Sequence, residues 1–199
     1  LSAGARHATA AVFENCFGSC EAIIVADENT FRVAGKDVVD SLARRGQTCA
    51  KPHIFASSVY AEYASVEELA ARLRENNAIP IAVGSGTIND LTKLASHSVN
   101  RPYIAVATAA SMDGYTAYGA SITDQGSKQT FDCPAPQAVI ADLDVIVEAP
   151  VGMNASGYAD LMAKCPAGAD WILADAAGEE AIDGPVWDTV QKELRRWLS

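Results

Sequence analysis

Two short stretches of the sequence combine glycine, hydroxyl and carboxylate residues in a way that suits the binding of a phosphorylated ligand. In the first, Gly84-Ser85-Gly86-Thr87 follows the apolar run at residues 79–83 and precedes an amphipathic segment. This order is typical of a strand, a tight turn and a helix. Glycine lets the backbone approach a ligand closely, and the first amides of a helix attract anions. We therefore expect a phosphate above this turn, although such turns also occur for purely structural reasons.

The second stretch, Thr108-Ala109-Ala110-Ser111, also follows an apolar run and is followed in turn by Asp113 and Gly114. In an open parallel sheet, ligands occupy the crevice beyond the carboxyl ends of the strands. The turns that follow two successive strands would therefore face the same space. Asp113 offers a carboxylate to that space, but an aspartate before a glycine is also typical of a simple turn.

Two further aspartates are candidates for binding. Asp27 follows the first apolar run, where its carboxylate would accept hydrogen bonds from ribose hydroxyls and repel a 2′-phosphate. An Asx turn explains the same residue without a ligand. Asp160 lies near a predicted helix start, where the helix dipole stabilises any carboxylate, whether or not it binds anything.

Five apolar runs, separated by helical patterns, indicate how these residues are positioned. Uninterrupted apolar character is typical of parallel strands that are covered on both faces. Strands that alternate with helices build a parallel sheet with right-handed crossovers. The sequence therefore predicts a Rossmann-like α/β sheet with flanking helices, whose strands are residues 22–27, 52–57, 79–83, 103–108, and 138–142 with 145–146.

Helical spacing of apolar residues predicts the helices between these strands. The first begins after a cap at Asn29 or Thr30, and the second begins at Ser65, which has capping-box spacing with Glu68. The third follows the glycine turn. Its apolar face carries Leu91, Leu94 and Ala95, and its polar face carries Asn89, Lys93 and Ser96.

The pattern changes after Gly114. Residues 120–123 and 128–131 flank a turn-rich tetrapeptide and predict a β-hairpin. From Asn154, which we expect to cap a helix, the sequence is helical, with a second helix at residues 167–177 and a third that carries Trp187 and Trp197. Three tryptophans in this short region carry more apolar area than we expect to remain in water.

The composition narrows the class of partner. The 199 residues carry a formal net charge of −10, which argues against a nucleic-acid or anionic-membrane surface and favours a small-molecule ligand. The longest apolar runs are roughly eight residues, far below the ~20 that span a bilayer. The five cysteines are an odd number, of which Cys16 and Cys20 have the spacing to share a helix face. A reduced, cytoplasmic location is the simplest interpretation.

Four motifs, taken together and in order, resemble the glycerol-1-phosphate dehydrogenase branch of the iron-containing alcohol dehydrogenase and glycerol dehydrogenase family. Dehydroquinate synthase is a more distant relative. The motifs are residues 27–30, 84–90, 108–114 and 157–164, and Ser85 stands where the family usually has a glycine. The resemblance implies a dinucleotide-binding α/β domain at residues 1–150. Residues 151–199 would begin an all-α metal and substrate domain whose remainder lies outside this chain.

The resemblance also implies roles for individual residues. Asp113 would contact the substrate hydroxyls as a catalytic residue, and Asp160 would be a catalytic ligand of a divalent metal, namely zinc, iron or nickel. The cofactor would be NAD or NADP. Its ribose would lie near Asp27, its pyrophosphate above Gly84, Ser85, Gly86, Thr87 and Ile88, and its nicotinamide beside Thr108, Ala109, Ala110 and Ser111.

The reaction that the resemblance implies is metal-assisted and NAD(P)-dependent. It would interconvert a polyol phosphate, sn-glycerol 1-phosphate, and its ketone, dihydroxyacetone phosphate, in a full-length protein that we expect to be a homo-oligomer. The family binds its metal through two histidines as well, but His7, His53 and His97 all precede Asp160. We therefore expect these histidines to be structural and this chain alone to be inactive.

Two alternatives remain open at this point. In the first alternative, the chain is a non-catalytic nucleotide-binding fragment. In the second, it is part of a carbon–oxygen lyase that resembles 3-dehydroquinate synthase. Turnover assays separate the first alternative from a dehydrogenase, and carbocycle formation from a heptulosonate phosphate separates the second.

Overall fold

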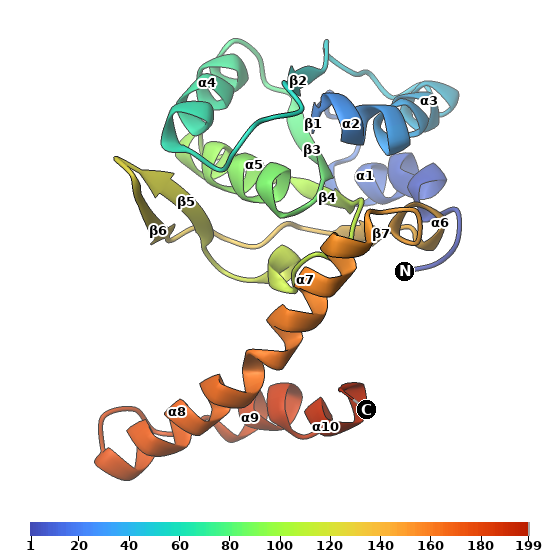
Figure 1. Ribbon diagram of the computed structural model, residues 1–199. Coiled ribbons are helices and arrows are strands. Elements are labelled where there is room, and N and C mark those ends of the chain that lie inside the picture. The colour runs from blue at the N-terminus through green and yellow to red at the C-terminus, as the bar shows by residue number, and fades with distance from the viewer. Residues whose placement is uncertain (199) are drawn as a thin grey trace.

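A parallel five-stranded sheet forms the centre of the computed structural model, which describes residues 1–198 (Figure 1). The strand order is β2-β1-β3-β4-β7, and every neighbouring pair is parallel. This order confirms the predicted Rossmann-like sheet. The strands are β1 (Ala22–Asp27), β2 (His53–Phe55), β3 (Ile79–Gly84), β4 (Ile104–Ala107) and β7 (Val139–Ala141).

The strands have apolar side chains on both faces because both faces of the sheet are covered. Ile23 and Val25 of β1 join the core on one face, while Ile24 and Ala26 join the core on the other. This division follows from the alternation of side chains along a strand. It explains why β1 shows no polar alternation in the sequence.

Two helices cover each face of the sheet (Figure 1). Buried residues of α4 (Tyr63–Arg74) and α5 (Gly86–Ser98) belong to one core, and those of α1 (Thr9–Phe17) and α3 (Lys36–Arg44) belong to the other. Short helical segments complete this part of the chain: η1 (Ala5–Ala8), α2 (Glu28–Thr30), the π-helical η2 (Phe31–Gly35), η3 (Gly114–Thr116) and α6 (Leu143–Ile146).

Three predicted element boundaries near strand ends are wrong. Asp27, not Asn29 or Thr30, caps the first helix. The second helix begins at Tyr63 rather than Ser65 and has no side-chain cap, and Glu62, the residue before it, bridges to Thr123. Val145 and Ile146 belong to α6 rather than to a strand, since the Asp142 carboxylate accepts the amide of Asp144 and starts a helical turn.

The predicted β-hairpin is confirmed. Strands β5 (Ala120–Asp124) and β6 (Ser127–Phe131) pair antiparallel across a turn at Gln125 and Gly126, which both have positive φ angles. Ala120 and Ile122 of β5 are buried in the same core as α4 and α5. The hairpin therefore covers a side of α5 that the sheet leaves open.

The C-terminal helices extend away from the sheet (Figure 1). Helix α7 begins at Val151, directly after Pro150, so Asn154 lies within its first turn and does not cap it. The third predicted helix is divided into two. The helices are α7 (Val151–Met162), α8 (Lys164–Ala177), α9 (Gly184–Gln191) and α10 (Leu194–Trp197).

These four helices bury little of their apolar surface. Gly168 and Leu194 are the buried residues among them. The rings of Trp171 and Trp187 pack with centroids 5.9 Å apart, whereas Trp197 is 53% exposed. The tryptophans are therefore only partly removed from water within the described residues.

Two predictions about the rest of the chain can be compared with the structure. All five cysteines have free thiols, and Cys20 lies beyond the end of α1, so it does not share a helix face with Cys16. Within residues 1–198, every helix is too short or too polar to cross a bilayer.

Candidate functional site

The turn between β3 and α5 has the geometry of an anion-binding site. Ser85 is the N-cap residue, in an extended conformation and with no side-chain capping bond, and α5 begins at Gly86. The Asn89 amide donates to the Ser85 carbonyl at 3.0 Å, so the amides of Gly86, Thr87 and Ile88 precede this bond. Such amides have no partner within the helix and point outward from its N-terminus.

In this turn, the Gly84 backbone packs directly against the Ile88 side chain. A Cβ atom on Gly84 would lie 2.5 Å from the Cβ of Ile88, so only glycine fits beside that side chain. The Ile88 side chain is fully buried in the core. Of Ile88, therefore, only the backbone amide is available to a ligand.

A cavity of about 810 Å³ brings together five of the predicted cofactor residues. It extends from the end of β1, past the β3–α5 turn and the end of β4, to the start of α7. Its size lies in the range of cofactor and small-molecule sites. The five residues in its lining are Asp27, Ser85, Thr87, Thr108 and Ala109.

Asp27 has a structural role within this lining. Its Oδ1 atom accepts the amides of Asn29 at 2.8 Å and Thr30 at 3.0 Å, which is the capping geometry of α2. The residue also lines the cavity. Binding of the ribose by Asp27 stays a prediction. The alternative interpretation, in which the carboxylate binds nearby backbone amides, describes the contacts that the structure shows.

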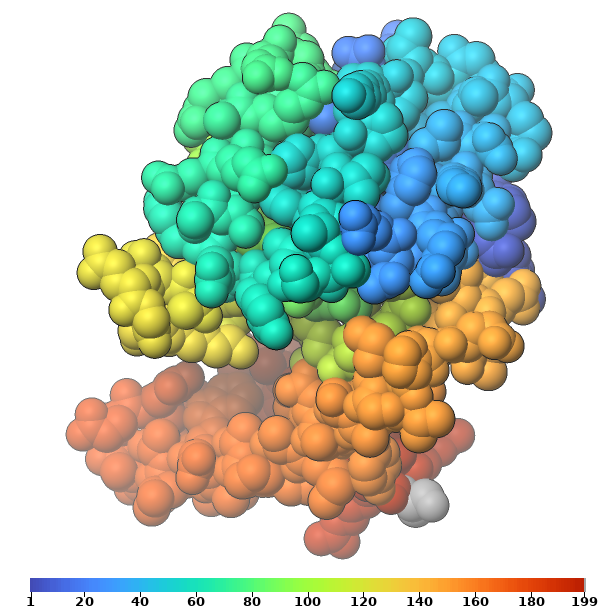
Figure 2. All heavy atoms as spheres, turned by 45° about the horizontal axis from the view of Figure 1, so that its top comes forward, coloured from blue at the N-terminus to red at the C-terminus, as the bar shows by residue number. Residues whose placement is uncertain are grey.

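A second cavity, of about 550 Å³, contains the remaining polar candidates. Ser85, Thr87 and Met153 line both cavities, so the two spaces meet at the β3–α5 turn. Figure 2 shows the yellow hairpin, the yellow-green chain after β4 and the orange C-terminal helices, which meet in this region. Predicted site residues in the second lining also include Gly86, Ser111, Asp113 and Asp160.

Ala110 lines neither cavity but fixes the position of α7. A Cβ atom on Gly157 would lie 1.9 Å from the Ala110 carbonyl oxygen, so this helix approaches the loop after β4 as closely as glycine permits. Asp160 lies one turn further along the same helix. The contact between Gly157 and Ala110 therefore sets the distance between Asp160 and the loop that carries Asp113.

Asp113 and Asp160, 47 residues apart in the sequence, are in direct contact. The amide of Asp113 donates to Asp160 Oδ2 at 2.9 Å, and Lys164 Nζ lies 2.6 Å from Asp113 Oδ2. The hydrogen bond from the Asp113 amide lowers the pKa of Asp160 below its ordinary value. Asp160 is therefore ionised at neutral pH. Lys164 belongs to the motif at residues 157–164 and begins α8, and its spacing of four residues from Asp160 was the signal in the sequence that pointed to a shared location.

Lys93 holds the loop that follows Asp113. Its Nζ atom donates to the carbonyls of Gly114 at 3.3 Å, Ala117 at 2.8 Å and Gly119 at 3.0 Å. Burial lowers the pKa of Lys93, which is 1% exposed. The predicted polar face of α5 is therefore not a solvent-facing one: Asn89, Lys93 and Ser96 are all buried, because the loop and hairpin cover them.

The described residues do not complete a metal site. Within residues 1–198, no group of three or more His, Cys, Asp or Glu side chains is placed to hold a metal ion. Asp160 offers one anionic ligand, whereas catalytic zinc sites take three protein ligands. His53, which pairs with Glu68 at 3.4 Å, lies on β2 and lines neither cavity.

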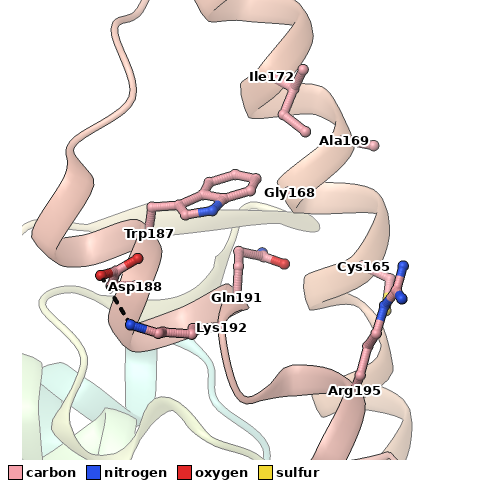
Figure 3. Close-up of a pocket in the computed structure, with 9 residues that line it drawn as sticks. All are labelled: Cys165, Gly168, Ala169, Ile172, Trp187, Asp188, Gln191, Lys192 and Arg195. Carbon is pink, nitrogen blue, oxygen red and sulfur yellow. Dashed lines mark ion pairs between the residues drawn. The ribbon is translucent and has the colours of Figure 1, made fainter.

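A third cavity, of about 410 Å³, lies between α8 and α9 and contains none of the predicted site residues (Figure 3). Trp187 and Gln191 face α8 at Gly168, where a Cβ atom would lie 2.6 Å from the Gln191 amide nitrogen. Lys192 and Asp188 form an ion pair at its edge, 3.6 Å apart. The cavity is a gap in helix packing rather than a candidate site.

Comparison with known proteins identifies relatives of this chain. Residues 1–150 match the family model described as iron-containing alcohol dehydrogenase. A protein of Halalkalibacterium halodurans named glycerol-1-phosphate dehydrogenase [NAD(P)+] is 37% identical over 180 residues, which are 89% of this chain and 45% of that protein. A protein of the same name from Methanococcoides burtonii is 38% identical over 77% of this chain and 42% of its own length. The chain thus spans less than half of these curated relatives.

Solved structures show the same fold. Glycerol dehydrogenase from Schizosaccharomyces pombe has a TM-score of 0.67 at 25% identity, over 81% of this chain and 41% of that one. NADH-dependent butanol dehydrogenase A from Thermotoga maritima has a TM-score of 0.72 at 17% identity, over 82% of this chain and 47% of that one, which is a likeness of fold alone.

Proposed function

Because this chain belongs to the iron-containing alcohol dehydrogenase family, we propose that it binds NAD or NADP and serves an oxidoreductase that interconverts sn-glycerol 1-phosphate and dihydroxyacetone phosphate. One observation carries this proposal. Two cavities meet at the N-terminus of α5, where Ser85 and Thr87 line both: the larger also contains Asp27, Thr108 and Ala109, and the smaller contains Asp113 and Asp160. A dehydrogenase needs this arrangement, because hydride passes between two adjacent ligands.

The larger cavity would hold the dinucleotide. The amides of Gly86, Thr87 and Ile88 and the hydroxyl of Ser85 would bind its diphosphate, with the helix dipole favouring the negative charge. Asp27 would accept from the ribose hydroxyls at one end. The nicotinamide would lie near Thr108, Ala109, Ala110 and Ser111, beside the second cavity. When bound, the cofactor accepts or donates the hydride.

The smaller cavity would hold the polyol. Asp113 would orient its hydroxyls, and the Asp160 carboxylate would be one ligand of the divalent metal that the family name implies. Within residues 1–198, no group of three or more His, Cys, Asp or Glu side chains supplies the rest of such a site. On this proposal, residues 1–150 are the cofactor domain and residues 151–199 begin the helical one.

Titration with NADH tests the proposal directly. Trp171, Trp187 and Trp197 all lie on the C-terminal helices and serve as energy donors to bound NADH. We expect tryptophan emission to fall and sensitised NADH emission to rise with saturation below millimolar cofactor. Absence of energy transfer at millimolar NADH, confirmed by calorimetry, would contradict cofactor binding.

A second candidate is a nucleotide-binding unit without turnover, which the incomplete metal site favours. Turnover of glycerol 1-phosphate with NAD+ and added Zn²⁺ separates the two. NADH binding with no turnover would support the binding unit. The relatives are named dehydrogenases, so a lyase resembling 3-dehydroquinate synthase is not favoured.

A further inference from the structure

We infer that Lys164 is a specificity-determining residue, which allows the substrate cavity to accept a phosphorylated polyol rather than a neutral one. This inference rests on the proposed function. It deepens that proposal by naming the side chain that makes an otherwise acidic cavity tolerate a phosphomonoester dianion.

The cavity lining is acidic without Lys164. Asp90, Asp113 and Asp160 all line it, and Lys128 is the one cation in that lining. Asp90 accepts the amide of Ser121 at 3.2 Å, while burial raises the pKa of its carboxyl. Lys93 adds a second ammonium behind the lining, where it is bonded to the carbonyls of Gly114, Ala117 and Gly119. The carboxylates still outnumber the ammonium groups without Lys164, which disfavours an anionic ligand relative to a neutral polyol.

Lys164 is not part of the lining, but it adds a positive charge next to the lining residue Asp113. Its Nζ atom lies 2.6 Å from Asp113 Oδ2, and the Asp113 amide in turn donates to Asp160 Oδ2 at 2.9 Å. The lysine side chain is 31% exposed and that of Asp113 is 44% exposed. The three residues form one chain of contacts, in which the ammonium contacts the Asp113 carboxylate directly and acts on the Asp160 carboxylate through its charge alone.

The positive charge of Lys164 is close enough to act on a ligand in the cavity. The screening length is about 8 Å at physiological ionic strength. An anion that contacts Asp113 therefore lies within one screening length of Lys164 Nζ, because the pair is only 2.6 Å apart. The effect on binding should be larger for a dianion than for a neutral molecule, and it should weaken as salt is added.

Ligand titration of the NADH-bound chain tests the inference, with the amides of Asp113 and Gly114 as NMR probes. The ligands are sn-glycerol 1-phosphate and glycerol. We expect Lys164→Met to weaken binding of the phosphate ester at least tenfold and to change binding of glycerol less than twofold. Lys164→Arg should restore most of the affinity, and the difference should shrink in 1 M salt. Lys192→Met, which removes an exposed lysine on the far helices, is the matched control.

Three outcomes would overturn the inference. Lys164→Met binds the phosphate ester as wild type does, or loses both ligands equally, or the wild-type chain binds NADH but shows no preference for the ester over glycerol. The first two outcomes leave cofactor binding intact and so leave the proposed function standing. The third also leaves cofactor binding intact, but it counts against the proposed phosphorylated substrate. Failure of the wild type to bind NADH would instead contradict the proposed function itself.

Discussion

The Nζ atom of Lys93 donates a hydrogen bond to the carbonyl oxygen of Ala117 at 2.8 Å, from a position that is almost completely buried. Lys93 belongs to α5, whose N-terminus faces the cofactor cavity, and Ala117 belongs to the loop that follows Asp113. The bond therefore joins the helix expected at the diphosphate to the loop expected at the substrate.

Replacement of Lys93 by Met should loosen the loop after Asp113. The carbonyls of Gly114, Ala117 and Gly119 lose their donor, and a buried group without a partner costs about 1–3 kcal/mol. Hydrogen exchange at the amides of Ala117 and Gly119 should become at least tenfold faster. Lys192→Met is the control, and unchanged exchange at these two amides would show that the lysine does not hold the loop.

Gly157→Ala should separate α7 from the loop after β4. The new Cβ would lie 1.9 Å from the Ala110 carbonyl oxygen, so the helix must move and the bond from the Asp113 amide to Asp160 must lengthen. Thermal melting should show a loss of about 1–3 kcal/mol, as for overpacking elsewhere. Gly152→Ala lies on the same helix in open space and should be neutral or stabilising by up to about 1 kcal/mol. Equal melting temperatures for the two variants would argue against the close contact.

Ser85→Asp should separate stability from cofactor binding. Aspartate is as good an N-cap as serine, and an acid at a helix N-terminus stabilises by about 0.3–1 kcal/mol. The same carboxylate would repel a diphosphate above the turn, so NADH affinity should fall at least tenfold in the energy-transfer titration. Ser85→Asn is the neutral control. If Ser85→Asp bound NADH as tightly as Ser85→Asn, the diphosphate would have to lie elsewhere.

Asp27→Asn should shift the cofactor preference toward NADPH. Asparagine keeps an oxygen that accepts the amides of Asn29 and Thr30, so the cap of α2 is preserved, while the charge of this lining residue is removed. The ratio of NADPH to NADH affinity should rise severalfold. Asp27→Ala, by contrast, should also lose about 0.5–2 kcal/mol of stability with the cap. A constant ratio in Asp27→Asn would place the 2′-hydroxyl away from this residue.

Asp142→Asn should lower stability in a pH-dependent way. Burial raises the pKa of Asp142, but hydrogen bonds from the Arg6 amide and guanidinium outweigh it, and the pKa lies below its ordinary value. The stabilisation is therefore present above the unfolded pKa of about 3.9 and is lost as the pH falls through the folded pKa. We expect the variant to be about 1–3 kcal/mol less stable at pH 7, by urea denaturation.

Urea denaturation at low pH tests whether the charge of Asp142 causes this stabilisation. The difference between wild type and Asp142→Asn should shrink below about pH 4, because protonated wild type loses the same charged interactions. Asp188→Asn removes one partner of an exposed ion pair and should differ from wild type by less than about 0.5 kcal/mol at either pH. A difference for Asp142→Asn that stays constant down to pH 2 would contradict the role of its charge.

Much of the fold was predictable from the sequence by itself. The strands are continuous apolar runs, and Gly84-Ser85-Gly86-Thr87 marks the turn before α5 because backbone freedom and helix-start chemistry are local properties. The hairpin at Gln125 and Gly126 was predictable for the same reason. Where a boundary differed, as at Tyr63, the residue before the helix bridges to a distant strand.

Only the tertiary structure decided how the candidate site is assembled. Lys93 belongs to the polar face of a helix by periodicity, yet it is buried because a loop more than twenty residues away folds over it. Asp113 meets Asp160 across 47 residues because Gly157 lets α7 contact the Ala110 carbonyl. Helical and strand periods describe near neighbours along the chain. The pairing of charges between distant segments depends on packing, which no local pattern contains.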